Sequence, residues 1–142
     1  MNQSDIDGML QQSLCDGKLS RAEKSILKAI LTNDVNEAVI SAARGVKIRT
    51  ISDNDKGFDP GSDMHRLHAA QIPVRMDTSP NHMHHKFAVF DGKIVVSGSY
   101  NWTRSAAEHN EENIVVTNNR QIVQAFGKQF EHLWPQMMPM ST

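Results

Sequence analysis

Residues 84–101 read HHKFAVFDGKIVVSGSYN, and this stretch contains the clearest folding signal in the chain. Two apolar runs, 86–90 and 93–96, stand on either side of the pair Asp91-Gly92. Such a pair between apolar runs favours a two-residue hairpin turn, because both of its residues readily adopt a positive φ. The stretch therefore predicts two antiparallel strands whose far ends lie side by side, together with the polar residues that follow or precede them.

Helical and strand-like patterns alternate on both sides of this hairpin. Apolar spacing and capping residues predict helices over 20–31, 34–45, 62–70 and 119–134, and strands over 46–51, 72–76 and 113–117. The loop 52–61 and the last seven residues carry no such pattern and are expected to be irregular. These elements predict the α/β class, with a mixed β-sheet flanked by helices and preceded by an N-terminal helical segment.

Length and composition are those of a single globular domain. The chain has 142 residues, of which 39% are hydrophobic, and its 15 basic and 16 acidic residues leave a formal net charge of -1. We expect residues 1–33 to form a polar lead-in and a helix, and residues 34–142 to form the domain itself. The charges are divided evenly, with 8 basic against 9 acidic residues in 1–60 and 7 against 7 afterwards, which excludes a strongly basic tail for binding nucleic acid.

The single cysteine, Cys15, excludes an intrachain disulfide framework. No apolar run reaches the length of a secretory leader or of a membrane-spanning helix. We therefore expect a cytoplasmic protein without a transmembrane segment.

Four polar side chains are expected to meet where the hairpin strands end. Side chains two residues apart in a strand point the same way, so His84 and Lys86 share one face. Ser99 and Asn101 are also two residues apart, just beyond Gly98. These four groups suit a tetrahedral anion, because an ammonium neutralises its charge while a hydroxyl and an amide donate hydrogen bonds to its oxygens.

The same residues carry a resemblance to a known family. The pattern H-x-K-x4-D-x6-G-S-x-N is formed by His84, Lys86, Asp91, Gly98, Ser99 and Asn101. This spacing resembles the signature of the phospholipase D superfamily, and the similarity covers about residues 34–134. The stretch 20–33 stands where the family has its first strand, so that strand is expected to be missing here.

The resemblance implies a phosphodiester hydrolase that uses no metal or other cofactor. One catalytic histidine attacks phosphorus to form a phosphohistidine, and a second protonates the leaving oxygen. Because this chain carries one copy of the motif, the resemblance to single-motif relatives implies a homodimer in which each subunit supplies its own His84. The residues that hold the phosphate in the family correspond to Lys86, Ser99 and Asn101.

The catalytic residues expected from the resemblance are His84, Lys86, Asp91 and Glu112. Glu112 is expected to orient His84 or to raise its basicity. Asp91 belongs to the signature, yet strand alternation turns it away from His84 and places it at the turn, which favours a structural role for it.

The substrate and the activity leave alternatives open. A nucleic acid, DNA or RNA, is favoured over a phospholipid because no apolar element for a membrane surface stands outside the expected core. Phospholipase activity on lipid head groups is the alternative. A second alternative is an inactive phosphate-binding module of the same fold, since loss of the first strand would leave an unpaired sheet edge.

Three imidazoles within four residues, His82, His84 and His85, raise the question of a metal site. Strand alternation points His85 away from the other two, and no cysteine or carboxylate lies close by in the sequence to complete four ligands. A calcium loop that begins at Asp53 is excluded because its twelfth position holds Met64. No metal is therefore expected.

Overall fold

The structure is a computed structural model that describes Ser20, Arg21, Lys24, Ser25, Leu27, Lys28 and the ranges 34–54, 63–102 and 109–141. Its helices are α3 (Val35–Ala43), α5 (Asp63–Ala69), α7 (Arg120–Leu133) and the 3-10 helix η1 (Trp134–Gln136). Its strands are β1 (Thr50–Asp53), β2 (Val74–Asp77), β3 (Phe87–Phe90), β4 (Ile94–Gly98), β5 (Ile114–Thr117) and β6 (Met138–Pro139). This alternation confirms the predicted α/β class.

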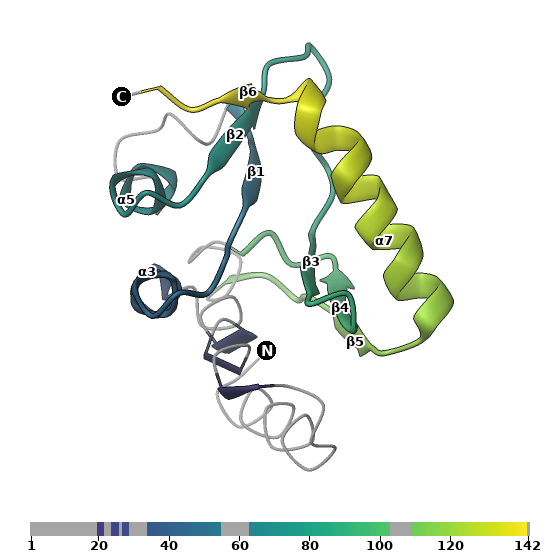
Figure 1. Ribbon diagram of the computed structural model, residues 1–142. Helices are drawn as coiled ribbons and strands as arrows, with labels where there is room; N and C mark the ends of the chain where they lie inside the picture. The colour runs from purple at the N-terminus through teal and green to yellow at the C-terminus, as the bar shows by residue number, and fades with distance from the viewer. Residues whose placement is uncertain are drawn as a thin grey trace.

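The described strands form two three-stranded sheets (Figure 1). In the first sheet, β1 pairs in parallel with β2, and β2 pairs antiparallel with β6, so this sheet is mixed as expected. In the second, β4 lies between β3 and β5 and is antiparallel to both. Helix α7 runs alongside from the β6 end to the β5 end and contacts β3 and β4 (Figure 1). Within the described ranges, no helix is both long and apolar enough to cross a membrane.

Helix α3 forms as its capping residues predict. The Asp34 carboxylate accepts a hydrogen bond from the Asn36 N–H at 3.1 Å. At the other end, Gly45 has a φ of 96°, and the Val46 N–H donates to the Ser41 carbonyl at 3.1 Å. This is a Schellman cap, which a glycine in the left-handed region allows at little cost.

Strand β1 lies further along the chain than the alternating pattern at 46–51 predicts. The Thr50 N–H donates to the Pro73 carbonyl at 3.0 Å, and the parallel register then runs to Asp53, which is paired with Asp77. The partner strand starts only after Pro73, which has no N–H for the ladder. The long-range pairing therefore decides the bounds of β1 and makes Asp53, expected in a loop, a strand residue.

The β3–β4 hairpin confirms the predicted pairing but corrects the length of the turn. Phe90 pairs with Ile94, which leaves three residues in the loop instead of two. Asp91 and Gly92 have φ angles of 51° and 63°, as expected for this pair. Cross-strand partners share a face, so this register joins two buried side chains. A two-residue turn would have placed exposed Lys93 opposite buried Phe90.

Each sheet has its own cluster of buried apolar side chains. The first consists of Leu67, Ile72, Val74, Met76 and Met140, and apolar residues of α3 pack against it. The second consists of Leu27, Phe90, Ile94 and Val96. Both clusters combine residues from distant parts of the sequence, so each sheet is stabilised by tertiary contacts and not by its own strands alone.

The N-terminal helix is supported where the structure describes it. Arg21, Lys24, Ser25, Leu27 and Lys28 are helical. Leu27 has 0% of its surface exposed and packs into the cluster of the second sheet. The rest of this predicted helix, residues 1–19 and most of the place of the family's first strand lie outside the described residues. The domain boundary between residues 33 and 34 stays a prediction.

The C-terminal tail belongs to the first sheet, which corrects the expectation of an irregular end. Strand β6 pairs with β2 through Met138 opposite Met76. Met137 and Met140 on either side are 9% and 5% exposed. A strand of two residues is too short to show a periodic pattern, and its pairing partner lies more than sixty residues away.

Helix α7 begins at the predicted cap. The Asn119 side-chain oxygen accepts the Ile122 N–H at 3.2 Å. Phe126 of the expected apolar stripe packs edge-on against Phe87 of β3, with 4.9 Å between ring centroids. Ile122 is 43% exposed, however, and its neighbour Val123 is 3% exposed, so the buried stripe is turned by one residue at this end.

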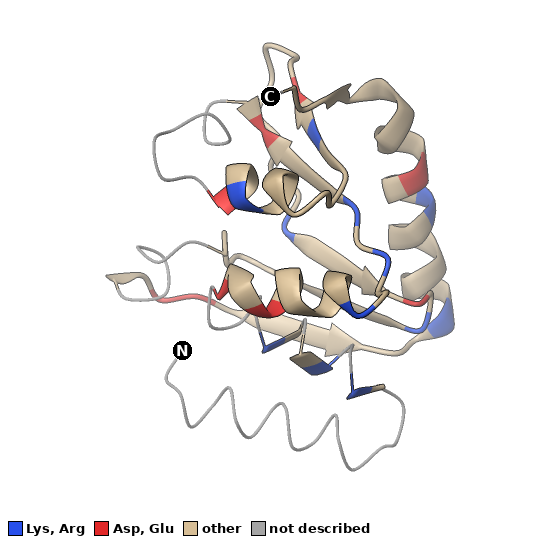
Figure 2. Cartoon of the chain, turned by 60° about the vertical axis from the view of Figure 1, so that its left-hand side comes forward, with Lys and Arg blue, Asp and Glu red and all other residues tan. Residues whose placement is uncertain are grey.

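Arginine–aromatic contacts hold α7 to the first sheet. The Arg49 guanidinium pairs with Glu131 and lies over the Phe130 ring, 4.9 Å from its centroid. Arg75 of β2 lies 4.6 Å from the Trp134 ring centroid and donates to the Trp134 carbonyl at 2.6 Å. The hydrogen bond from Arg49 lowers the pKa of Glu131. Along α7 itself, the basic residues Arg120 and Lys128 are followed by one acidic residue, Glu131 (Figure 2).

Met76 and Met138 provide a matched test of this core, because they are cross-strand partners that differ in exposure, 1% against 58%. Met76→Ala is expected to lower the free energy of unfolding by about 2–5 kcal/mol, since it leaves a cavity between β2 and its helices. Met138→Ala is expected to change it by less than about 0.5 kcal/mol. Urea unfolding followed by circular dichroism measures both, and equal effects would contradict the burial of Met76.

Candidate active site

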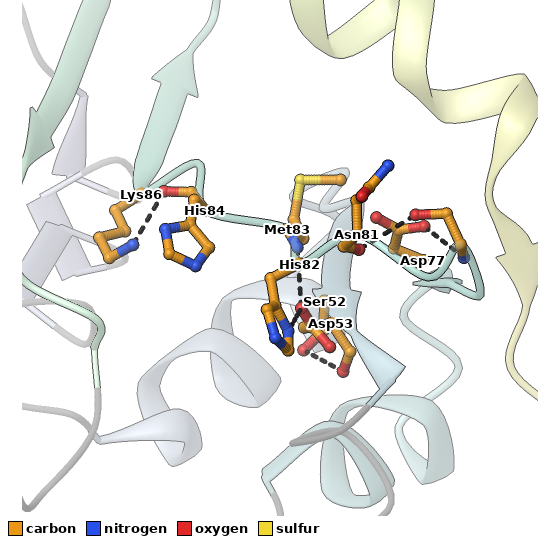
Figure 3. A network of polar contacts seen from close by, with 9 residues as sticks. Ser52, Asp53, Asp77, Asn81, His82, Met83, His84 and Lys86 are labelled. Atoms are coloured by element: carbon orange, nitrogen blue, oxygen red, sulfur yellow. Dashed lines mark hydrogen bonds and ion pairs between the residues drawn. The ribbon is translucent and has the colours of Figure 1, made fainter.

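His84 and Lys86 lie in the segment that leads into β3, not inside a strand as predicted. The Lys86 ammonium turns back and donates a hydrogen bond to the His84 carbonyl at 2.8 Å (Figure 3). His84 is exposed, whereas Lys86 is half-buried. The two residues are brought together as expected, but by this hydrogen bond and not by a shared strand face.

The other two histidines of the segment have separate surroundings. The His85 ring lies edge-on to Phe87, with 5.5 Å between centroids, and its Nε2 is 3.4 Å from the Gln129 side chain on α7. The His82 ring lies on the side of His84, with 5.9 Å between centroids. Within the described parts of the chain, no group of three or more His, Cys, Asp or Glu residues is placed to hold a metal ion.

Ser99 and Glu112 form a hydrogen-bonded pair where β4 and β5 separate. The pairing of Gly98 with Ile114 is extended by the Ser99 N–H, which donates to the Asn113 carbonyl at 3.1 Å. The Ser99 hydroxyl donates to the Glu112 carboxylate and accepts the Asn113 N–H at 3.1 Å. A hydroxyl has one proton to donate. Ser99 can therefore donate a hydrogen bond to a phosphoryl oxygen only when its hydrogen bond to Glu112 is broken.

The Glu112 carboxylate is held in its ionised form. Hydrogen bonds from Ser99 and Asn110 lower its pKa, partial burial opposes them, and the positive charge of Lys86 lowers it further by a smaller amount. Phe87 pairs with Ser97, and Gly98 pairs with Ile114, so the residues before β3, after β4 and before β5 lie at the same end of the second sheet. Cation, carboxylate and hydroxyl thus gather at one edge of the second sheet.

Gly98 permits this close arrangement. A Cβ at this position would lie 2.1 Å from the Asn113 carbonyl oxygen and 3.0 Å from the Ile114 Cα. Both are backbone atoms of the neighbouring strand, so a side chain could be accommodated only by separating β4 from β5. The glycine of the signature therefore has a structural reason, because it allows Ser99 to reach Asn113.

Not every predicted residue is brought to this edge. Asp91 is exposed in the β3–β4 turn, at the opposite end of the hairpin from Lys86, which agrees with a structural role. Asn101 is exposed beside Tyr100, whose hydroxyl is buried and has no hydrogen-bond partner among the described residues. Burial, and to a smaller extent the charge of Glu112, raises the pKa of Tyr100. The assigned roles of these residues stay predictions.

Two aspartates that sequence reasoning left out of the site contact the segment before β3 (Figure 3). Asp53 at the end of β1 accepts the Met83 N–H at 2.8 Å and lies 3.5 Å from His82 Nδ1. Asp77 at the end of β2 accepts the Ser79 N–H at 2.9 Å. The carboxyl ends of neighbouring parallel strands often border α/β sites. That signal could have found Asp53 only if the extent of β1 had been known.

A family model described as "Cardiolipin synthase, PLD-like domain" matches residues 17–134. This range contains every residue of the signature and the strands β1 to β5, whereas β6 follows it. It begins before residue 34, so the match includes part of the segment that was expected to precede the similarity.

Similar proteins carry related names. The chain is 39% identical over 119 residues to the mitochondrial cardiolipin hydrolase of Chlamydomonas reinhardtii, which covers 83% of this chain and 53% of that protein. It is 41% identical over 127 residues to the mitochondrial cardiolipin hydrolase of Xenopus tropicalis, which covers 87% of this chain and 60% of that protein. The chain therefore spans little more than half the length of these curated relatives.

A solved structure has the same fold. It is that of Nuc from Salmonella typhimurium, a phospholipase D family member, which superposes with a TM-score of 0.67 at 25% sequence identity. The superposition covers 76% of this chain and 73% of that one.

Removing the Ser99 hydroxyl tests whether its hydrogen bond lowers the pKa of Glu112. Ser99→Ala removes the largest cause of the low Glu112 pKa, so this pKa is expected to rise toward the ordinary value, as measured by 13C NMR titration of the carboxyl group. A depressed carboxyl pKa stabilises the fold above the unfolded-state value, and this contribution is lost as the pH falls through the folded-state value. The variant should therefore lose less stability on acidification. Ser97→Ala is the control. Ser97 lies on β4, two residues before Ser99, and its replacement should leave the Glu112 pKa unchanged.

Proposed function

Since this chain belongs to the phospholipase D-like family, we propose that it hydrolyses phosphodiester bonds at the edge of the second sheet. The observation that carries the proposal is the register of β3, β4 and β5, which brings Lys86, Ser99 and Glu112 to the same end of the second sheet. An ammonium at the same end of the sheet as an exposed imidazole and a carboxylate is suited to neutralise a phosphoryl group as it is attacked. The names of the cardiolipin hydrolase relatives support the same class of reaction.

In the proposed reaction, His84 is the nucleophile. A neutral imidazole nitrogen attacks phosphorus, so that a P–N bond forms and the bond to the leaving oxygen breaks. A second, protonated histidine gives its proton to that oxygen. A water molecule then attacks the phosphohistidine, gives its proton to the second histidine and frees His84. One phosphodiester and one water thus become a phosphomonoester and an alcohol, with Lys86 supplying positive charge and no metal required.

The second histidine comes from a second copy of the chain in this proposal. His85 is turned toward α7, and the resemblance to single-motif relatives implies that the second histidine belongs to a partner subunit. A two-fold axis beside the exposed His84 would bring the partner subunit's His84 to the other side of the phosphate. The exposure of His84 supports this arrangement, because a shared site needs the imidazole at the surface.

The proposed substrate is a phospholipid. The two relatives that are 39% and 41% identical are named for cardiolipin, which favours a lipid phosphodiester. The formal charge of -1 and the interspersed acidic and basic residues of Figure 2 offer little to a polyanion, whose binding depends on many cationic contacts. This proposal takes the place of the nucleic-acid substrate expected from the sequence, and the cytoplasmic location stays a prediction.

Hydrolysis of bis(p-nitrophenyl) phosphate in excess EDTA tests the chemistry apart from the substrate. The wild type is expected to turn over, and His84→Asn to lose at least about a hundredfold, because nucleophile and acid are both removed. His65→Asn, an exposed histidine on α5, is the matched control and should keep wild-type turnover. Turnover that requires a divalent metal, or that survives in His84→Asn, would contradict the mechanism.

The substrate class is tested with the same pair of proteins on vesicles that contain cardiolipin and, separately, on single-stranded DNA, duplex DNA and RNA. We expect His84-dependent cleavage of the lipid and little or none of the nucleic acids. Cleavage of nucleic acid alone would overturn the lipid proposal and restore the expectation from the sequence. A folded wild type that cleaves none of these phosphodiesters would favour the inactive phosphate-binding module.

Mixing subunits tests the shared site. When wild type and His84→Asn are unfolded, combined in equal amounts and refolded, random pairing leaves about one quarter of the dimers with two histidines. Activity per wild-type chain should then fall to about one half of that of wild type treated alone. Activity that is unchanged by mixing would mean that each chain acts by itself. Light scattering at micromolar concentration gives the oligomeric state of the same samples.

A further inference from the structure

The residues that lead from β2 to His84 are held at both ends by carboxylates of the first sheet. We name residues 78–83 the approach loop. At its start, the Ser79 N–H donates to Asp77 at 2.9 Å. At its end, the Met83 N–H donates to Asp53 at 2.8 Å (Figure 3). The path of the chain into His84 is therefore set by the ends of β1 and β2.

The two carboxylates stand side by side because of the parallel register. Asp53 and Asp77 are Cα partners at the carboxyl ends of β1 and β2. Asp77 is 7% exposed, and the Asp53 side chain is 15% exposed. Neighbouring carboxylates with so little access to water require hydrogen-bond donors. The approach loop supplies such donors as backbone N–H groups, and His82 Nδ1 lies 3.5 Å from Asp53.

Asp53 acts at the residue directly before His84. The peptide group of Met83 is fixed by its hydrogen bond to Asp53, and the carbonyl of His84 is fixed by Lys86 at 2.8 Å. The backbone is thus held on both sides of the imidazole. The His84 side chain itself is exposed, so its place depends on the fixed backbone and on the His82 ring, whose centroid lies 5.9 Å away.

We infer that Asp53 is a positioning residue that aims His84 at the phosphate by accepting the Met83 N–H. This inference rests on the proposed function, in which His84 attacks phosphorus. Asp53 is not placed at the reacting atoms. It acts through the Met83 N–H and, by its contact with His82 Nδ1, through the ring beside His84. Its contribution is therefore to the rate of the chemical step and not to substrate binding, because orientation of a nucleophile alters the attack without altering the contacts that hold the phosphate.

Two substitutions at Asp53 separate this role from a general effect on the fold. Asp53→Ala removes the acceptor and is expected to lower kcat by about tenfold to a hundredfold, with KM within about twofold of wild type. Asp53→Asn keeps an oxygen that can accept the Met83 N–H, and its kcat is expected to stay within about threefold of wild type. Asp63→Ala is the control for loss of an acidic residue. It removes a carboxylate on α5 that pairs with Arg66 at 3.4 Å. Wild-type kcat in Asp53→Ala, or a folded Asp53→Asn no better than Asp53→Ala, would overturn the inference.

A second measurement does not depend on activity. Amide hydrogen exchange by 15N NMR is expected to show that the Met83 amide of the wild type exchanges more slowly than the amides of exposed His84 and His85. In Asp53→Ala this protection should be lost and the His84 ring resonances should shift, whereas Asp53→Asn should keep both. If the wild type hydrolyses no phosphodiester, the proposed function fails and these signals alone decide the position of His84. If Asp53→Ala does not fold, an unprotected Met83 amide in the wild type or in Asp53→Asn would overturn the inference, and a protected one supports it.

Discussion

Strand β4 hydrogen-bonds to β3 on one side and to β5 on the other, and polar residues gather where these two pairings end. The distance between β4 and β5 at that point is set by Gly98, whose missing side chain leaves room for the Asn113 backbone. With the strands this close, the Ser99 hydroxyl bridges the Glu112 carboxylate and the Asn113 N–H. A wider gap would remove the Ser99 hydrogen bond, which is the largest cause of the low Glu112 pKa. The charge distribution of the site therefore depends on a backbone contact.

The first sheet contributes a different kind of support. Its parallel strands end in Asp53 and Asp77, which bind the approach loop and thereby direct the chain into His84. Helix α7 connects the two sheets, because Phe126 packs on Phe87 of the second sheet while Arg49 and Arg75 hold the other end of the helix to the first. His84 and Lys86 precede β3, and the Ser99–Glu112 pair lies at the same end of the second sheet.

Local chemistry made much of the fold predictable. Asp34 and Asn119 cap their helices as expected, since a cap is a contact between residues two or three positions apart. The turn at Asp91-Gly92 was equally readable, because both residues tolerate a positive φ. The bounds of β1, the third residue of the hairpin loop and the strand β6 were not. Each of these is decided by a partner far away in the sequence, and the alternation of a single strand contains no information about that partner.

The sequence by itself determined which chemical groups are available and how they are spaced, from His84 to Asn101, and this was sufficient to indicate the family and the candidate nucleophile. Only the tertiary structure decided which of these groups meet. Asp91, inside the signature, lies at the far end of the hairpin, whereas Asp53, more than thirty positions earlier, contacts the residue before His84. The physical reason is that the register of paired strands, set by burial and by backbone hydrogen bonds over long separations, determines where a carboxylate lies, and spacing along the chain does not.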